Sequence, residues 1–361
     1  MSAAQWRRAM NSAAAAAAPT SRVPVARSAP ALAQSAAAET VPSWPARFVA
    51  RIRPRHVVVL VALVVYPFVA SPFFTYQIGA QALALGLIAL SLTFLGGYGV
   101  AIFGTSSVAA ISLGWPWWLA SAVAIVVATA FAAAVGWLSV RTEGIYTIMI
   151  TLAIGVAFFY LAQQNYTVLN GFQGFNHPGA PEFLGTESRD PVPFYFAALV
   201  CALAGYFLVR HLVRAPFGIA LQGIRDNPRR MASLGFDVTA HRVAAYAVSG
   251  LLAAVGGVLM VWYNGRISSG TVNLGAMISI LIIAVLGGMK HPIGAFIGAI
   301  VYVLLQNFAI DLFVRERFNL VIGAGFLAIV LFSPDGLLGL WAKLRSSLIK
   351  TQTHQQTRRQ L

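Results

Sequence analysis

The sequence predicts an all-α fold, that of a polytopic membrane protein with about ten transmembrane helices. Hydrophobic residues make up 58% of the 361 residues and charged residues 10%, which is too little charge to cover a soluble chain of this length. The apolar residues form repeated runs about as long as a bilayer is thick. The cations behind the net charge of +15 lie between these runs, where the positive-inside rule explains them. The expected partner of this surface is membrane lipid, not nucleic acid.

The chain divides by composition into three segments. Residues 1–55 are rich in alanine, serine, proline and arginine and contain one acid, Glu39, which predicts a disordered basic cytoplasmic tail. An organellar transit peptide has the same arginine-rich, acid-poor character and is the alternative for this segment. Residues 56–340 form the predicted transmembrane domain, and residues 341–361 form a cytoplasmic C-terminal tail.

The transmembrane domain contains about ten apolar runs of spanning length. They are 57–74, 77–95, 97–113, 116–139, 145–162, 193–210, 243–263, 273–289, 292–311 and 318–334. The run 97–113 is rich in glycine and serine, and the sequence leaves open whether it is a full span or a re-entrant one. Dividing ten spans into two sets of five gives the two halves opposite orientations, because each half has an odd number of spans, and this is the geometry of an inverted repeat. Two inverted five-helix halves are therefore a second open question.

The distribution of charge predicts which side each loop occupies. With the basic tail inside, an even number of spans returns the C-terminus to the inside. The basic loop 210–242, Arg141 and Lys290 then also fall inside. The loop 163–192 falls outside and is acidic on balance. We therefore expect both termini and the loop 210–242 to be cytoplasmic.

The spans contain almost no residues that could carry chemistry. Glu143 and Asp311 lie at span edges, and the histidines fall in loops, tails or span ends. Ion-coupled carriers keep ionisable groups inside the membrane, so the pattern argues against ion coupling. The single cysteine, Cys201, lies in an apolar run. We find no catalytic constellation and no metal-ligand spacing, and we expect no enzyme, no metal and no cofactor.

The chain also lacks the motif of an ATPase. Its lysines are Lys290, Lys343 and Lys350, and none of them follows the glycines of a phosphate loop. Small residues line the apolar runs instead. They include Gly256 and Gly257, and the pair Gly294 and Gly298, whose spacing lets helix backbones approach closely. The sequence thus predicts close helix packing and an energy source outside this chain.

The loop 214–235 is the longest charged interruption between apolar runs, and its residues predict a helix, a break, a short helix and a stop. Pro216 suits a first helical turn, Asn227 followed by Pro228 suits a second helix start, and Gly235 supplies a left-handed helix end. The loop carries the charged residues Arg225, Asp226, Arg229 and Arg230. A surface bound by a partner and an ordinary basic loop that fixes topology are both compatible with this pattern.

The same loop resembles that of a known family. Its pattern is Arg214, Pro216-Phe-Gly218, Ala220, Ile224-Arg-Asp-Asn227, Ala232, Leu234-Gly235 and Val238. It is similar to the cytoplasmic loop of branched-chain amino acid ABC transporter permeases of the LivM type. The small-residue stretches 245–257 and 286–298 also resemble this family, and the likeness covers roughly residues 75–340.

The resemblance implies a coupling role for this loop, because the family docks it onto a separate ATPase subunit. The implied coupling residues are Arg214, Pro216, Gly218, Ile224, Arg225, Asp226, Asn227, Arg229 and Gly235.

The resemblance also locates a substrate pathway, although two stretches depart from the family pattern. The family places a glycine turn after a helix that corresponds to 146–152, and the sequence 170–174 matches only part of that turn. The stretch 103–109 replaces another family motif. The candidate pathway residues are Thr105, Ser106, Ser107, Thr151, Asn170, Gly171 and Gly174. The departures put the family's usual solute in question.

The function that the resemblance implies is import of branched-chain or related amino acids across a bacterial inner membrane. The chain would be the permease subunit, and its partners would be a second permease subunit, cytoplasmic ATPase subunits and a periplasmic substrate-binding protein. The alternative is an ATP-independent channel or facilitator for small neutral solutes such as urea or amides. Both share charge-poor spans, but only the importer has a use for a structured cytoplasmic loop.

Overall fold

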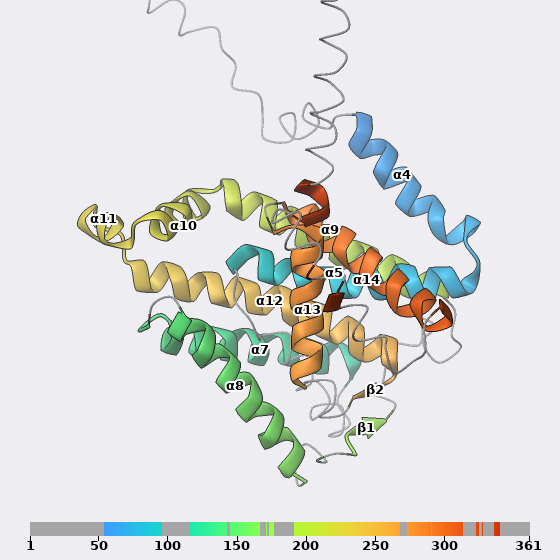
Figure 1. The fold of residues 1–361 in the computed structure, drawn as a ribbon, viewed down its shortest axis with the longest axis horizontal. Helices are drawn as coiled ribbons and strands as arrows, with labels where there is room; N and C mark the ends of the chain where they lie inside the picture. The colour runs from blue at the N-terminus through green and yellow to red at the C-terminus, as the bar shows by residue number, and fades with distance from the viewer. Residues whose placement is uncertain are drawn as a thin grey trace, which may run out of the picture. The chain divides into compact units, whose positions relative to one another are not determined.

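The computed structural model (Figure 1) describes residues 54–95, 116–142, 145–166, 191–267, 273–289 and 291–312, with short pieces at 171, 173–176, 323–324, 327 and 336–339. The chain divides into two units, Met1–Leu60 and Val61–Leu361, and the packing described below lies within the second. The predicted N- and C-terminal tails, the span 97–113 and most of the span 318–334 lie outside the described residues.

Apart from one pair of two-residue strands, the regular structure is helical. The helices are α4 (Pro54–Val69), the π-helix η1 (Phe74–Ala80), α5 (Gln81–Leu95), α7 (Trp117–Ser139), α8 (Ile145–Gln164), α9 (Pro191–Arg214), α10 (Pro216–Asp226), α11 (Pro228–Ser233), α12 (Val238–Asn264), α13 (Leu274–Gly287) and α14 (Pro292–Leu312). Strand β1 (Phe175–Asn176) pairs antiparallel with β2 (Arg266–Ile267). The all-α prediction is confirmed for the described part of the chain, where each predicted span falls on a helix.

Within the described residues, four helical segments are long and apolar enough to cross a membrane: Phe74–Ser91, Trp117–Ser139, Val192–Arg214 and Val238–Asn264. Helices α13 and α14 would add a fifth span if they are counted together, and they are bent by 118° at the break between them. The 14 residues of α13 reach only about 21 Å, less than the hydrocarbon core of a bilayer. The sequence predicts two separate spans here, whereas the structure has a short helix bent sharply onto a longer one.

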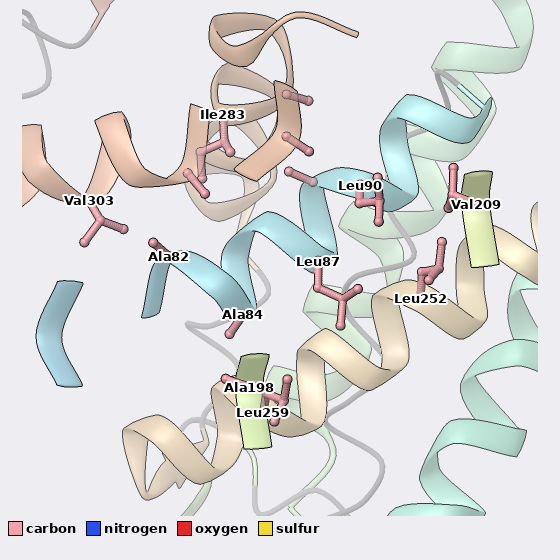
Figure 2. Close-up of a cluster of buried hydrophobic side chains, with 14 of the residues drawn as sticks. Ala82, Ala84, Leu87, Leu90, Ala198, Val209, Leu252, Leu259, Ile283 and Val303 are labelled. Carbon is pink, nitrogen blue, oxygen red and sulfur yellow. The ribbon is translucent and has the colours of Figure 1, made fainter. Parts of the chain in front are cut away.

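Helix α5 packs against several other helices and is apolar on all sides, as expected for a helix without a solvent face. Leu87 and Leu90 of α5 are almost completely buried. Figure 2 shows them in one cluster with side chains from four other helices. Those side chains are Ala198 and Val209 of α9, Leu252 and Leu259 of α12, Ile283 of α13 and Val303 of α14.

Glycines bring these helices close together, as their spacing predicts. A Cβ atom on Gly256 of α12 would lie 2.6 Å from Cγ1 of Ile88 on α5. A Cβ atom on Gly298 of α14 would meet the carbonyl oxygen of Ile283 on α13. A buried hydrogen bond adds to the first contact, since Ser249 Oγ donates to the Ser91 carbonyl at 2.9 Å. Helix α12 is therefore joined closely to the central helix.

Candidate functional site

Helix α10 is held against the end of α9 by a glycine. Pro216 occupies the first turn of α10, where its missing N–H leaves no hydrogen bond unmade. A Cβ atom on Gly218 would meet the carbonyl oxygen of Leu212 and lie 2.6 Å from Val213 Cα. Those atoms are backbone and cannot rotate away, so the contact requires glycine. Ala220 and Ile224 are buried on α10 together with Gly218.

The break between α10 and α11 is formed by the residues that the sequence indicates. Asn227 is extended, with φ −155° and ψ 95°, and its side-chain oxygen accepts a hydrogen bond from the Arg230 backbone N–H at 3.0 Å. Pro228 follows at the start of α11. This is an N-cap, which offsets one of the unpaired donors at a helix start. The predicted second helix start is confirmed.

Helix α11 ends in a Schellman motif. Gly235 has φ +89°, a backbone conformation that glycine adopts without a Cβ penalty. Its N–H donates to the Ala232 carbonyl at 3.0 Å, and the Phe236 N–H donates to the Met231 carbonyl at 3.1 Å. These are the two hydrogen bonds that define the motif. The predicted stop at Gly235 is confirmed.

The outward surface of the α10–α11 loop combines cations with exposed apolar side chains. Ile219 is 63% exposed and Leu234 is 65% exposed. Arg225 pairs with its neighbour Asp226 at 3.3 Å, and both side chains are largely exposed, so the pair contributes little to stability. Arg214, Pro216, Asn227, Arg229 and Arg230 are exposed too. Among the predicted coupling residues, Gly218 and Ile224 are therefore buried, while the others lie at the surface of the loop.

Sequence reasoning missed three rings at the base of the loop. His241, in the first turn of α12, stacks on Phe217 with ring centroids 5.9 Å apart and planes 18° apart. It also makes a T-shaped contact with Phe236, with centroids 5.8 Å apart and an interplanar angle of 71°. The only local signal for this contact was that a phenylalanine follows Pro216, which starts α10, and another follows Gly235, which ends α11.

The candidate pathway residues are brought together only in part. Gly171 and Gly174 lie in a turn after α8, with φ +56° and +65°, and the Gly171 N–H donates to the Asn165 carbonyl at 3.1 Å. Thr151 is buried within α8, at about 20 Å along the helix from its end at Gln164. Thr105, Ser106, Ser107 and Asn170 lie outside the described residues.

The turn after α8 is joined to the far end of α12. Phe175 pairs with Ile267 and Asn176 pairs with Arg266, and β2 directly follows the C-cap of α12 at Gly265. The α10–α11 loop directly precedes the other end of α12 (Figure 1). The 27 residues of α12 extend about 40 Å, enough to cross a bilayer. If α12 spans, the loop and the turn lie on opposite sides of the membrane.

Two tyrosines donate hydrogen bonds at the C-terminal end of α12. Tyr76 donates its hydroxyl hydrogen to the Tyr263 carbonyl at 2.8 Å, and the two rings stack with centroids 4.8 Å apart. The Tyr263 carbonyl is in the last turn of α12, where carbonyls lack a partner within the helix. Tyr263 in turn donates to Gln81 Oε1 at 3.4 Å. In the part of the chain that the structure describes, no group of three or more His, Cys, Asp or Glu side chains could hold a metal ion.

Comparison with known proteins gives the family. The profile described as branched-chain amino acid transport system / permease component matches residues 66–330. The chain is 24% identical over 316 residues to the high-affinity branched-chain amino acid transport system permease protein LivM of Escherichia coli (strain K12), covering 78% of this chain and 74% of that protein. It is 25% identical over 248 residues to the protein of the same name in Salmonella typhimurium, covering 62% of this chain and 58% of the relative, which is less than two thirds of the relative's length.

Another relative, matched over a shorter stretch, is named for the import of a sugar. The chain is 27% identical over 157 residues to the ribose import permease protein RbsC of Haemophilus influenzae, covering 41% of this chain and 46% of that protein. No solved structure matches the chain. The matched family region contains the α10–α11 loop, α12 and the turn after α8. The chain belongs to the branched-chain amino acid transport permease family and is a multi-pass membrane permease component, not itself an enzyme.

Proposed function

We propose that the protein is the permease subunit of an ABC importer that moves branched-chain or related amino acids across a bacterial inner membrane. The observation that carries the proposal is the α10–α11 loop. It is held in a fixed shape by Gly218, the Asn227 cap and the Gly235 Schellman motif, and it presents cations and exposed apolar side chains outward. A loop that only fixes topology needs positive charge but no defined shape.

The partners follow from the energy source. The sequence has no phosphate loop, so in an importer ATP would be hydrolysed by a separate subunit that binds from the cytoplasm. The α10–α11 loop is the surface that it would bind, with Arg225, Arg229 and Ile219 among the contacts. The complete transporter would contain a second permease subunit, two ATPase subunits and a periplasmic substrate-binding protein. Closure of the ATPases would then move the loop as a lever and switch the spans between outward and inward access.

The same proposal fixes the topology. About ten spans in two inverted halves would place both termini and the loop 210–242 in the cytoplasm, with residues 1–55 and 341–361 as cytoplasmic tails. The cation asymmetry along the sequence supports this orientation. The length of α12 supports the loop and the turn after α8 lying on opposite sides.

The substrate would enter from the side of the turn after α8. Gly171 and Gly174 form this turn, and the pairing of β1 with β2 holds it beside the end of α12. Asn170, Thr151 and the stretch with Thr105, Ser106 and Ser107 would line the pathway with small polar groups and backbone. A pathway of this kind suits solutes whose net charge is zero, such as zwitterionic amino acids.

The test is uptake of radiolabelled leucine into proteoliposomes that contain the permeases, with and without the ATPase subunits and ATP. We expect uptake only in the complete, ATP-supplied complex. Leucine or urea uptake by the chain alone, at the same rate as in the complex, would support the facilitator instead. Uptake by the chain alone that accelerates with an inward proton gradient would contradict both the importer and the facilitator.

A further inference from the structure

The first turn of α12 contains a ring that reaches both ends of the α10–α11 loop. Asp237 caps α12 by accepting a hydrogen bond from the Ala240 N–H at 2.9 Å. His241, one turn later, places Nδ1 2.7 Å from the Asp237 carbonyl oxygen. A carbonyl oxygen can only accept, so Nδ1 donates the hydrogen. The imidazole is thereby fixed against the start of α12.

The two rings that His241 contacts belong to the two ends of the loop. Phe217 lies in the first turn of α10 and stacks on the imidazole. Phe236 follows α11, makes a T-shaped contact with the imidazole and donates its N–H to Met231 to close α11. The three residues Phe217, His241 and Phe236, which we call the ring joint, therefore connect α10, α11 and α12 at one point.

The ring joint leads directly into the packed part of the molecule. Beyond His241, α12 bonds to α5 through Ser249 and Ser91 and approaches α5 closely at Gly256. On its other side, the loop rests on the backbone of α9 through Gly218. A displacement of α10 and α11 would therefore move the start of α12 if the ring joint stays closed, because His241 of α12 contacts one ring from each end of the loop.

We propose that His241 is a positioning residue that transmits movement of the α10–α11 loop to α12 through its ring contacts with Phe217 and Phe236. This role rests on the proposed function, in which an ATPase docks on that loop. The ring contacts transmit the movement, and the hydrogen bond to Asp237 orients the imidazole. Loss of the rings should leave the docking surface intact but break the link between ATP hydrolysis and transport.

Two substitutions at one position separate the ring from the hydrogen bond. His241→Phe keeps an aromatic ring between Phe217 and Phe236 but cannot donate to the Asp237 carbonyl. His241→Asn keeps a side-chain donor and removes the ring. Thr239→Ala, at an exposed position in the same helical turn, is the matched control. For each variant we would measure membrane abundance, co-purification of the ATPase, ATP hydrolysis, and leucine transported per ATP hydrolysed in the complete complex.

We expect His241→Asn to bind the ATPase and hydrolyse ATP normally while moving less leucine per ATP by about fivefold or more, the lower end of ordinary coupling between sites. His241→Phe and Thr239→Ala should keep the wild-type ratio. A wild-type ratio in His241→Asn would overturn the ring joint, as would a low ratio in His241→Phe with a normal one in His241→Asn. Poor membrane accumulation of His241→Asn would mean that the ring is needed for folding, and this result would also overturn the proposed role of the ring joint. Failure of the wild-type chain to bind any ATPase would instead overturn the proposed function, and the ring joint with it.

Discussion

The two ends of α12 are built in different ways. At the N-terminal end, the α10–α11 loop buries one face of α10 and leaves Ile219 and Leu234 more than 60% exposed. At the C-terminal end, Asn264 and Arg266 are exposed, but the tyrosines and the strand pair make their polar contacts within the molecule. Tyr76 donates to the Tyr263 carbonyl, Tyr263 donates to Gln81, and β2 pairs with β1.

Under the proposed function, the two ends have different roles. The C-terminal end is fastened to its own chain, as expected where helices and turns must hold a pathway in place. The N-terminal end has a shape defined by its helix caps, but its cations and apolar side chains point outward, as expected for a surface that another subunit binds. Both ends use a left-handed glycine, so the contrast lies in what the surface offers and not in how the helices stop. The predictions below test that contrast with matched changes at the two ends.

The largest effect is expected from inverting a charge on the loop. Arg225→Glu would place a carboxylate where a docked ATPase meets a guanidinium, at a cost of about 2–5 kcal/mol in binding. That corresponds to a dissociation constant weakened by roughly thirtyfold or more. Co-purification of the ATPase and a binding titration measure this change in the dissociation constant. Arg266→Glu makes the same inversion at the exposed opposite end of α12 and should leave ATPase binding unchanged. Equal loss in both variants would mean that overall charge, not docking, determines binding.

The next-largest effect is expected at the contact between α10 and the backbone of α9. Gly218→Ala would push a methyl group into the backbone of Leu212 and Val213, at a cost of about 1–3 kcal/mol or a shift of α10. The matched change is Gly223→Ala, whose methyl group would meet Met231 Sδ at 2.7 Å, the flexible end of a side chain that can move. We expect ATPase binding to fall in the first variant and to stay near normal in the second. If the two variants behave alike, the contact with α9 does not position the loop.

Left-handed glycines allow the same substitution at both ends. Gly235 and Gly265 have φ +89° and +58°, and a Cβ atom on either would have nothing within 4 Å. Valine should therefore cost only backbone strain, about 1–3 kcal/mol at each position. Gly235→Val should reduce ATPase co-purification because it misplaces the end of α11. Gly265→Val should lower thermal stability without altering ATPase binding, and a reversal of the two phenotypes would contradict the assignment of the two ends.

The smallest effect is expected at the C-terminal end. Tyr76→Phe removes the hydroxyl that caps the Tyr263 carbonyl but keeps the stacked ring. A hydrogen bond of this kind contributes about 0.5–1.5 kcal/mol. We expect a small drop in the unfolding temperature of the detergent-purified protein and no change in ATPase binding. A loss of ATPase binding here would mean that the two ends are not independent.

Local signals in the sequence were sufficient to predict the loop, because caps and helix stops depend on neighbouring residues. Pro216, Asn227 and Gly235 each have the predicted backbone role. The ring joint could not be predicted, since Phe217 and His241 are far apart in sequence and meet only after α10 and α11 have turned. Pairing of β1 with β2 was missed for the same reason, because a two-residue strand has no recognisable pattern.

For the membrane spans, too, the sequence did not predict which distant segments come into contact. Small-residue spacing predicted that Gly256 and Gly298 would allow close packing, but it could not name the partner helices, α5 and α13. The sequence predicts separate spans at 273–289 and 292–311, with residues 290–291 as the loop between them. In the structure α13 ends at Gly287, and Gly287, Gly294 and Gly298 allow α14 to lie against the backbone of α13. Apolar length predicts that these segments enter the membrane, but it does not predict the 118° bend between α13 and α14.

The most direct test of the account is the accessibility of the two ends of α12 in intact cells. In a chain with Cys201→Ala, Ser233→Cys would report on the exposed surface of α11 and Asn264→Cys on the exposed last residue of α12. A membrane-impermeant thiol reagent should label the Asn264→Cys chain from outside and the Ser233→Cys chain only after permeabilisation. Adding the ATPase to permeabilised membranes should then protect Ser233→Cys alone. Labelling of both from the same side, or of Ser233→Cys from outside, would contradict a cytoplasmic docking loop at the N-terminal end of α12.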